Sequence, residues 1–271
     1  MSGTLLEVRN LSKYFDGNPA LDDVSFDLQK AETLGVVGES GSGKTTLARC
    51  ILRAIDPDRG TVRFNSQNGW VDLHDASEKT LISLRREMQM VFQDPFASLN
   101  PRMTVQKIIE EPLIIHGERN ALKRRERVMD ILERVQLEPD ALLRYPHAFS
   151  GGQRQRIGIA RALVLHPEFI VCDESVSALD VSVQAQIINL LRELQQELGL
   201  TYLFVAHDLS VVRYLCDRVL VMHRGRVIES GFVEDVFQRP EQSYTRLLLS
   251  AIPSPDPDIP LKPLDRTMLG L

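Results

Sequence analysis

Cysteine is scarce in this sequence, with three residues among 271. Cys50, Cys172 and Cys216 are far apart, odd in number and without a C-x-x-C pair. Neither a disulfide framework nor a zinc site is therefore predicted, and a reducing compartment is expected.

Long apolar runs are also lacking. None reaches the roughly 18 residues that a membrane-spanning helix needs, and the opening MSGTLLEVRN has no apolar segment of the kind found in signal peptides. We expect a cytosolic protein, unless it docks on something in a membrane.

An excess of basic charge is missing as well. Asp and Glu number 37 against 32 Lys and Arg, so the formal net charge is −5 and no nucleic-acid partner is predicted. The basic clusters KRRER (123–127) and RQR (154–156) are short, and we interpret them as solvated helix faces. The length suits one large domain, or a domain with a subdomain.

The stretch GESGSGKT (38–45) fits the phosphate-loop pattern G-x-x-x-x-G-K-[ST]. It lies between an apolar run at 33–38, expected as a buried parallel strand, and a helix expected from Lys44 to about Ala54. This context disfavours a chance glycine turn and predicts a nucleoside triphosphate site. Lys44 would reach the β and γ oxygens, and Thr45 would bind Mg²⁺. The predicted nucleotide-binding residues here are Gly38, Ser40, Gly41, Ser42, Gly43, Lys44, Thr45 and Thr46.

Polar side chains follow several other apolar runs. Asp173 ends the run FIVCD, where it would coordinate Mg²⁺, and Glu174 after it is the candidate general base. His207 closes TYLFVA and is expected to contact the γ-phosphate. Gln93 follows MQMVF and would contact the magnesium or the attacking water. A paired surface Asp-Glu and a structural histidine are the alternatives.

The stretch FSGGQRQR (149–156) is an unusual helix start. Ser150 and Gln153 have the spacing of a capping box, which does not need the two glycines between them. Because bare amides at a helix start suit an anion, this segment predicts a second phosphate-binding element.

The order of elements predicts an α/β fold: a P-loop NTPase core with a parallel sheet, an N-terminal antiparallel β subdomain and an inserted α-helical subdomain. The alternating run at 24–29 is expected as a half-buried strand of the antiparallel part. Residues 65–80 are expected to be irregular. The inserted helices are placed at about 94–149, with Leu122, Val128, Leu132 and Val135 on one helix face. After residue 150 we expect helices and strands to alternate, with strands at 169–173, 201–206 and 218–222.

Together these motifs, in this order and with SALD (177–180), resemble the ATP-binding-cassette ATPases over about residues 5–250. In that family two cassettes dimerise head to tail, and the signature of one binds the γ-phosphate held by the other. The resemblance therefore implies that a partner's nucleotide is bound by Ser150, Gly151, Gly152 and Gln153. It also implies a nucleotide contact for Asp180 and an aromatic residue on adenine. Phe15 fits the Lys-x-aromatic spacing, with Tyr14 as the alternative and core packing possible for either.

Three longer stretches, 89–105, 175–187 and 239–257, resemble the oligopeptide, dipeptide and nickel branch of importers, and most closely the second ATPase of its heteromeric pair. The resemblance implies ATP and Mg²⁺ as cofactors. It implies a second ATPase subunit, two transmembrane permease subunits and an extracytoplasmic solute-binding protein as partners. The chain would be peripheral, on the cytoplasmic face of the inner membrane.

Two further expectations concern the C-terminal part of the chain. Many members of this branch have a cysteine-rich iron–sulfur segment, whereas no cysteine follows Cys216 here, so no cluster is predicted. The cassette domain is expected over 1–252, followed by an extended Pro-rich tail at 253–271. The alternative function is a soluble accessory ATPase, such as a subunit of a carbon–phosphorus lyase complex.

Overall fold

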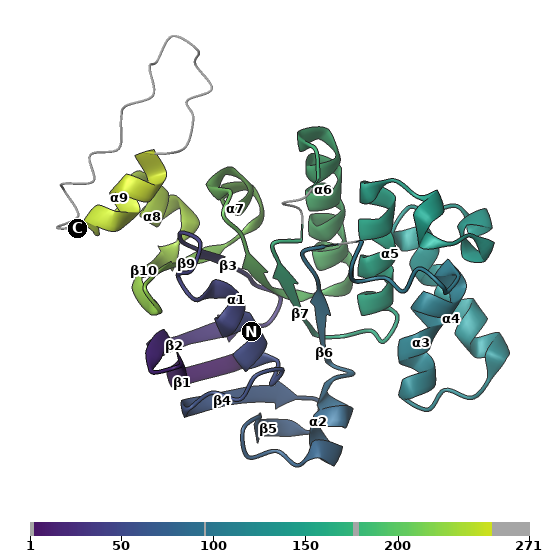
Figure 1. Ribbon diagram of the computed structural model, residues 1–271, viewed down its shortest axis with the longest axis horizontal. Helices are drawn as coiled ribbons and strands as arrows, with labels where there is room; N and C mark the ends of the chain where they lie inside the picture. The colour runs from purple at the N-terminus through teal and green to yellow at the C-terminus, as the bar shows by residue number, and fades with distance from the viewer. Residues whose placement is uncertain (1–2, 95, 176–178, 251–271) are drawn as a thin grey trace, which may run out of the picture.

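A computed structural model of the protein describes residues 3–94, 96–175 and 179–250. The predicted tail at 253–271 and two residues of the SALD motif, Ser177 and Ala178, lie outside the described residues. Within them the chain forms two β-sheets with helices around the second sheet (Figure 1).

The first sheet is antiparallel, with strand order β2-β1-β4-β5. Its strands are β1 (Thr4–Phe15), β2 (Asn18–Gln29), β4 (Arg59–Ser66) and β5 (Gly69–Asp72). The alternating run at 24–29 is the second half of β2, where Val24, Phe26 and Leu28 are buried. These side chains form part of one core cluster with buried residues of the second sheet.

The second sheet has strand order β10-β9-β3-β8-β7-β6, in which β3, β6, β7, β8 and β9 are parallel to one another and β10 pairs antiparallel with β9 at one edge. Its strands are β3 (Thr33–Val37), β6 (Met88–Val91), β7 (Phe169–Asp173), β8 (Thr201–Val205), β9 (Arg218–His223) and β10 (Arg226–Phe232). Strands β3, β7 and β8 are buried throughout, as their continuous apolar runs predict. The predicted α/β class with an antiparallel part is confirmed.

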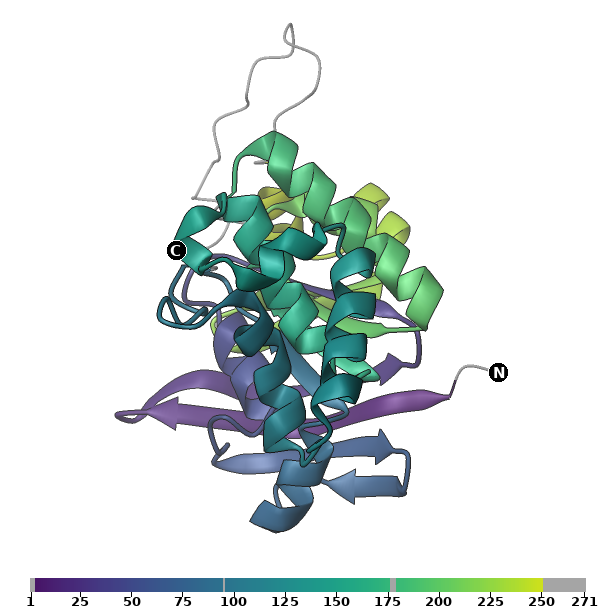
Figure 2. The same cartoon turned by 90° about the vertical axis from the view of Figure 1, so that its right-hand side faces the viewer.

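The helices lie around this sheet, both over its faces and at its two ends (Figure 1). At one end are α3 (Val105–Ile115), α4 (Ala121–Arg134) and α5 (Gly151–Leu163), with two 3-10 helices, Pro139–Leu143 and Pro146–Ala148. Figure 2 views the molecule from this side, with α3 and α4 in the foreground. The other helices are α1 (Lys44–Ile51), α2 (Glu78–Leu84), α6 (Val181–Leu198), α7 (Leu209–Leu215), α8 (Val233–Gln238) and α9 (Ser243–Ser250). Helices α8 and α9 lie at the end opposite α3 and α4 (Figure 1).

The expectation that residues 65–80 are irregular is wrong. Strand β5 pairs with β4, and Trp70 lies across from Asn65 with the Arg63 guanidinium 5.1 Å from its ring centroid. Ser77 then caps α2 by accepting a hydrogen bond from the backbone N–H of Thr80. The strand has four residues, too few for a clear alternation of burial.

Two details of the helices also differ from expectation. The helix predicted to reach about Ala54 ends at Ile51, and Arg53 beyond it has a positive φ of 52°. In α4, Val128 and Leu132 are buried as predicted, and so is Val135 at the helix end, but Leu122 is 73% exposed. Leu122 lies in the first turn, beyond the surface that α4 packs on its neighbours.

Candidate nucleotide-binding site

The phosphate loop connects β3 to the N-terminus of α1. Gly43 caps this helix with a φ of 103° and, lacking a side chain, leaves the first N–H groups uncovered. The hydroxyl of Ser42 is buried and has no hydrogen-bond partner among the described residues. A helix N-terminus beside a buried hydroxyl fits a phosphate group.

Lys44 lies inside this loop, 5% exposed. Its Nζ donates hydrogen bonds to the carbonyl oxygens of Gly38 at 2.8 Å and Glu39 at 2.9 Å. Burial lowers the pKa of Lys44, and the nearby carboxylates of Glu174 and Asp173 counteract that shift. The ammonium is therefore held by loop carbonyls close to where a phosphate would sit.

Thr45 and Asp173 meet across the loop and β7. The Thr45 hydroxyl donates a hydrogen bond to Oδ1 of Asp173 at 3.2 Å. Burial raises the pKa of Asp173, and the hydrogen bond from Thr45 counteracts the rise. A hydroxyl beside a buried carboxylate is a donor set that suits Mg²⁺.

The structure brings together three of the predicted strand-end residues. Because β7 lies between β6 and β8, Glu174 has Gln93 on one side and His207 on the other. The Gln93 amide donates a hydrogen bond to Oε2 of Glu174 at 2.7 Å, and Nδ1 of His207 lies 3.7 Å from the same oxygen. Glu174 itself has a positive φ of 45°, an uncommon conformation for this residue type. Polar groups thus converge on one carboxylate beside the phosphate loop.

Phe15 is the last residue of β1, pairs with Asn18 at the start of β2, and is 46% exposed. Ala20, slightly further along β2, has its carbonyl oxygen only 2.3 Å from where a Cβ on Gly43 would lie. The hairpin end that carries Phe15 therefore adjoins the phosphate loop. One face of the Phe15 ring has the Lys13 ammonium 5.4 Å from its centroid.

The signature residues, 150–153, are not bonded to the phosphate loop of the same chain in the part that the structure describes. The capping box exists: the backbone N–H of Gln153 donates to the Ser150 hydroxyl at 3.3 Å, and that of Ser150 to Oε1 of Gln153 at 3.0 Å. No hydrogen bond or ion pair between described residues links 150–153 to 38–46. Asp180 caps α6 by accepting from the Val183 N–H at 3.0 Å.

Gly152 has a packing role that sequence reasoning missed. A Cβ at Gly152 would lie 2.3 Å from Cγ1 of Val183, a distance that real Cβ atoms do not show. The first turns of α5 and α6 therefore approach closely because residue 152 has no side chain. No sequence pattern signals this contact, because Val183 is an ordinary apolar residue near the start of α6.

Two arginines of α5 hold the segment around Gln93. The Arg154 guanidinium lies 4.1 Å from the ring centroid of Phe96, and that of Arg161 lies 5.6 Å from the ring centroid of Phe92. Arg161 also donates a hydrogen bond to the carbonyl oxygen of Ser98. The RQR cluster, interpreted from sequence as a solvated face, in fact supplies one of these contacts through Arg154.

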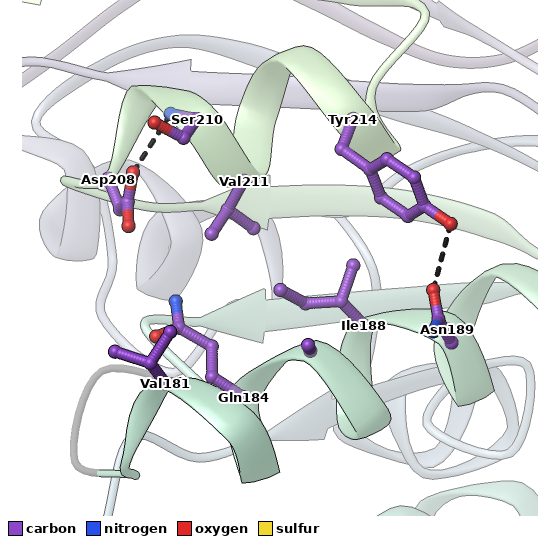
Figure 3. A pocket seen from close by; sticks show the side chains of 9 residues that line it. Val181, Gln184, Ile188, Asn189, Asp208, Ser210, Val211 and Tyr214 are labelled. Carbon is purple, nitrogen blue, oxygen red and sulfur yellow. Dashed lines mark hydrogen bonds between the residues drawn. The ribbon is translucent and has the colours of Figure 1, made fainter. Parts of the chain in front are cut away.

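A groove of about 440 Å³ lies between α6 and α7 (Figure 3). It lies next to the candidate site in sequence, since its lining includes Val181, which follows Asp180, and Asp208, which follows His207. The Tyr214 hydroxyl donates to Oδ1 of Asn189 at 2.8 Å across one end. None of the predicted site residues lines this groove.

The chain is similar to known proteins over most of its length. A family model described as "ABC transporter" matches residues 21–177. The chain is 56% identical over 258 residues to a putative peptide import ATP-binding protein of Brucella ovis, covering 94% of this chain and 80% of the relative. It is 53% identical over 264 residues to the oligopeptide transport ATP-binding protein OppF of Bacillus subtilis, covering 95% and 85%.

Solved structures that resemble the chain also include transporter cassettes. A dimeric, post-hydrolysis state of the ATP-binding cassette MJ0796 bound to ADP and Pi is similar with a TM-score of 0.74 and 31% identity, covering 84% of this chain and 99% of that one. The cbiO1 protein of Clostridium perfringens, described as part of the transporter complex cbiONQ, has a TM-score of 0.78 and 32% identity, covering 88% and 92%.

The chain therefore belongs to the ABC transporter family. It is an ATP-binding cassette ATPase, and the resemblance to the oligopeptide-importer branch is confirmed by its relatives. In the described part of the chain, no helix is both long and apolar enough to cross a bilayer.

Proposed function

We propose that this chain is the ATP-hydrolysing subunit of a membrane importer of peptides or similar small solutes. The observation that carries the proposal is its identity of more than half, over most of its length, to relatives named for peptide import. The phosphate loop and the polar strand ends supply matching chemistry. These names do not favour the alternative of a carbon–phosphorus lyase accessory ATPase.

The nucleotide-binding roles follow from the loop geometry. The uncovered N–H groups of α1 and the Ser42 hydroxyl bind phosphate oxygens, and Lys44 neutralises charge on the β and γ oxygens. Thr45 and Asp173 hold Mg²⁺, which offsets phosphate charge when bound, and Gln93 is a further candidate ligand. Phe15 stacks on adenine from the adjoining hairpin end.

Hydrolysis is assigned to the group around Glu174. As general base, this carboxylate takes a proton from the attacking water. His207 contacts the γ-phosphate, and Gln93 positions Glu174 or the water. Gln93 and His207 already lie beside the same carboxylate oxygen of Glu174, which supports their assignment to one catalytic group.

The signature serves a second nucleotide in trans. Ser150, Gly151, Gly152 and Gln153 lie at the start of α5 and, among the described residues, make no hydrogen bond or ion pair with their own loop, which supports a role across a cassette dimer. Asp180 would lie at the same interface. The partner is a second ATPase subunit, in a heterodimer.

Coupling to membrane subunits is assigned to the helical segment at about 94–149. We propose that it receives a cytoplasmic helix of the permease and that the chain is peripheral on the cytoplasmic face of the inner membrane. Two permease subunits and an extracytoplasmic solute-binding protein complete the importer.

A reconstitution experiment tests this function. The chain is purified in detergent with its co-eluting membrane proteins, and the complex is placed in vesicles with labelled oligopeptides and a solute-binding protein. We expect ATP-dependent peptide uptake, lost when the ATPase carries Lys44→Ala. Co-elution with soluble phosphonate-cleaving enzymes and no uptake would refute the importer assignment.

A further inference from the structure

We infer that Tyr244, on the C-terminal helix α9, is a positioning residue for the phosphate loop and that α9 is part of the nucleotide-binding unit. This inference rests on the proposed nucleotide site. The backbone N–H of Glu39 in the loop donates a hydrogen bond to the Tyr244 hydroxyl at 3.1 Å. The two residues are 205 positions apart in the chain.

Tyr244 is fixed in place from several sides. Its side chain is 6% exposed and belongs to the core cluster. Its ring lies 4.2 Å, centroid to centroid, from the ring of His223 at the end of β9. Burial raises the pKa of Tyr244, and the hydrogen bond from Glu39 counteracts the rise.

The start of α9 is tied to β10. The carboxylate of Glu229 accepts hydrogen bonds from the backbone N–H groups of Glu241 at 2.8 Å and Gln242 at 3.1 Å. Leu248 and Leu249, further along α9, pack against the core cluster. Because α9 is anchored before and after Tyr244, the hydroxyl meets the loop at a fixed point.

The phosphate loop also contacts the end of β9 and the turn that follows this strand. The Gly225 N–H donates to the Ser42 carbonyl oxygen at 3.0 Å. Gly38 has a φ of 151°, and a Cβ there would lie 2.2 Å from the Met222 carbonyl oxygen. Together with Tyr244, these contacts hold the loop against the C-terminal part of the chain.

The contact with Tyr244 acts on Lys44 through a single residue. Glu39 donates its N–H to Tyr244, and its carbonyl oxygen accepts from Nζ of Lys44 at 2.9 Å. The Glu39 N–H also shares a planar peptide unit with the Gly38 carbonyl, which accepts from Nζ of Lys44 at 2.8 Å, so fixing this N–H limits how the Gly38 carbonyl can turn. Without the hydroxyl, the Glu39 N–H loses its acceptor and the loop gains freedom that phosphate binding must remove.

The test is Tyr244→Phe, which keeps the ring and removes the hydroxyl. We expect ATP affinity, measured by calorimetry without Mg²⁺ so that hydrolysis does not interfere, to fall about two- to tenfold, the range that one net hydrogen bond gives. The Glu39 amide should exchange with deuterium faster by a similar factor in protein without nucleotide. The matched control is Tyr214→Phe, whose lost hydroxyl bonds Asn189 in the α6–α7 groove, and it should change neither value.

The outcomes separate the two claims. If the wild type and Lys44→Ala bind ATP alike, the proposed nucleotide site is wrong. If the wild type binds ATP and Tyr244→Phe matches Tyr214→Phe in both affinity and exchange, the positioning role is wrong. A fall in ATP affinity with unchanged exchange at Glu39 would also overturn it, because the effect would then not pass through the loop.

Discussion

The side-chain amide of Gln93 donates a hydrogen bond to Oε2 of Glu174, and His207 approaches the same oxygen from the next strand. Gln93 and His207 come from strands on either side of β7. Their convergence makes Glu174 the centre of the candidate site and the first residue to test.

Glu174→Gln should leave ATP binding intact and slow hydrolysis by about 10²–10⁴, the usual contribution of a positioned general base. Glutamine keeps the size of the side chain, so the contacts with Gln93 and His207 change little in geometry. Single-turnover hydrolysis in the purified complex measures the effect, with Glu78→Gln on α2 as control. Near-normal turnover would remove Glu174 from the proposed chemistry.

Lys44→Ala should weaken ATP binding or turnover by about 10- to 100-fold, because a hydrogen bond to a charged group contributes about 1.5–3 kcal/mol. No other described cation reaches the carbonyls of Gly38 and Glu39. Equilibrium binding and steady-state hydrolysis are measured beside Lys30→Ala, which removes an exposed partner of Glu168. Equal values for the two variants would reject the loop assignment.

Ser150→Arg tests whether the signature acts in trans. Loss of the cap should cost about 0.5–2 kcal/mol of stability. If the signature binds a partner's phosphate, the variant should bind ATP normally at its own loop and disable the composite site of its partner. Nucleotide trapping, assigned to each ATPase subunit of a mixed assembly, distinguishes these effects. Damage confined to the variant's own loop would leave only the capping role.

Gly152→Ala should destabilise the protein by about 1–3 kcal/mol through overpacking against Val183. Val183→Ala in the same chain should restore most of that loss, giving a clear coupling in a double-mutant cycle. Gly158→Ala is the control, because a Cβ on this other α5 glycine has no heavy atom within 4 Å apart from its own helix backbone and chain neighbours. Denaturant unfolding measures all four variants. Additive effects of the Gly152 and Val183 substitutions would contradict the contact.

The three thiols should react slowly with a disulfide reagent in the native protein. All are buried, and burial raises the pKa of Cys50 to about 11, that of Cys172 to about 12 and that of Cys216 well above its usual value. Raised values mean less thiolate at pH 8 than in the unfolded chain. Reaction should therefore become fast only in denaturant. Fast labelling of one native thiol would indicate local opening around it.

Much of the candidate site was predictable because parallel strands end at one edge of their sheet. Once Asp173, His207 and Gln93 were placed at strand ends, their proximity followed from the topology. The sequence did not reveal strand order, so it could not show that Gln93 and His207 would meet at Glu174. Nor could the sequence reveal the close packing of Gly152 against Val183 or the hydrogen bond between Tyr244 and the phosphate loop. Each of these contacts joins two segments that share no local sequence pattern.

The errors in the fold have the same origin. Trp70 and its neighbours looked irregular because β5 is stabilised by pairing with β4 and by Arg63, not by an alternation of its own. Leu122 fitted the helical period but lies where no neighbouring element covers it. Periodicity predicts which side chains can be buried, whereas burial itself needs a partner surface.

The contacts of Arg154 and Arg161 with Phe96 and Phe92 have a mechanical consequence. They fasten the segment that carries Gln93 to α5, whose first turn begins at Ser150. We therefore expect a displacement of that segment to move α5 and, with it, the signature at the start of the helix. In the proposed dimer, the Gln93 segment of each chain lies beside that chain's own nucleotide, and its signature lies beside the nucleotide of the neighbour. A change at one nucleotide would then reach the other through α5. The timing of the two sites would be coupled without any direct contact between their nucleotides.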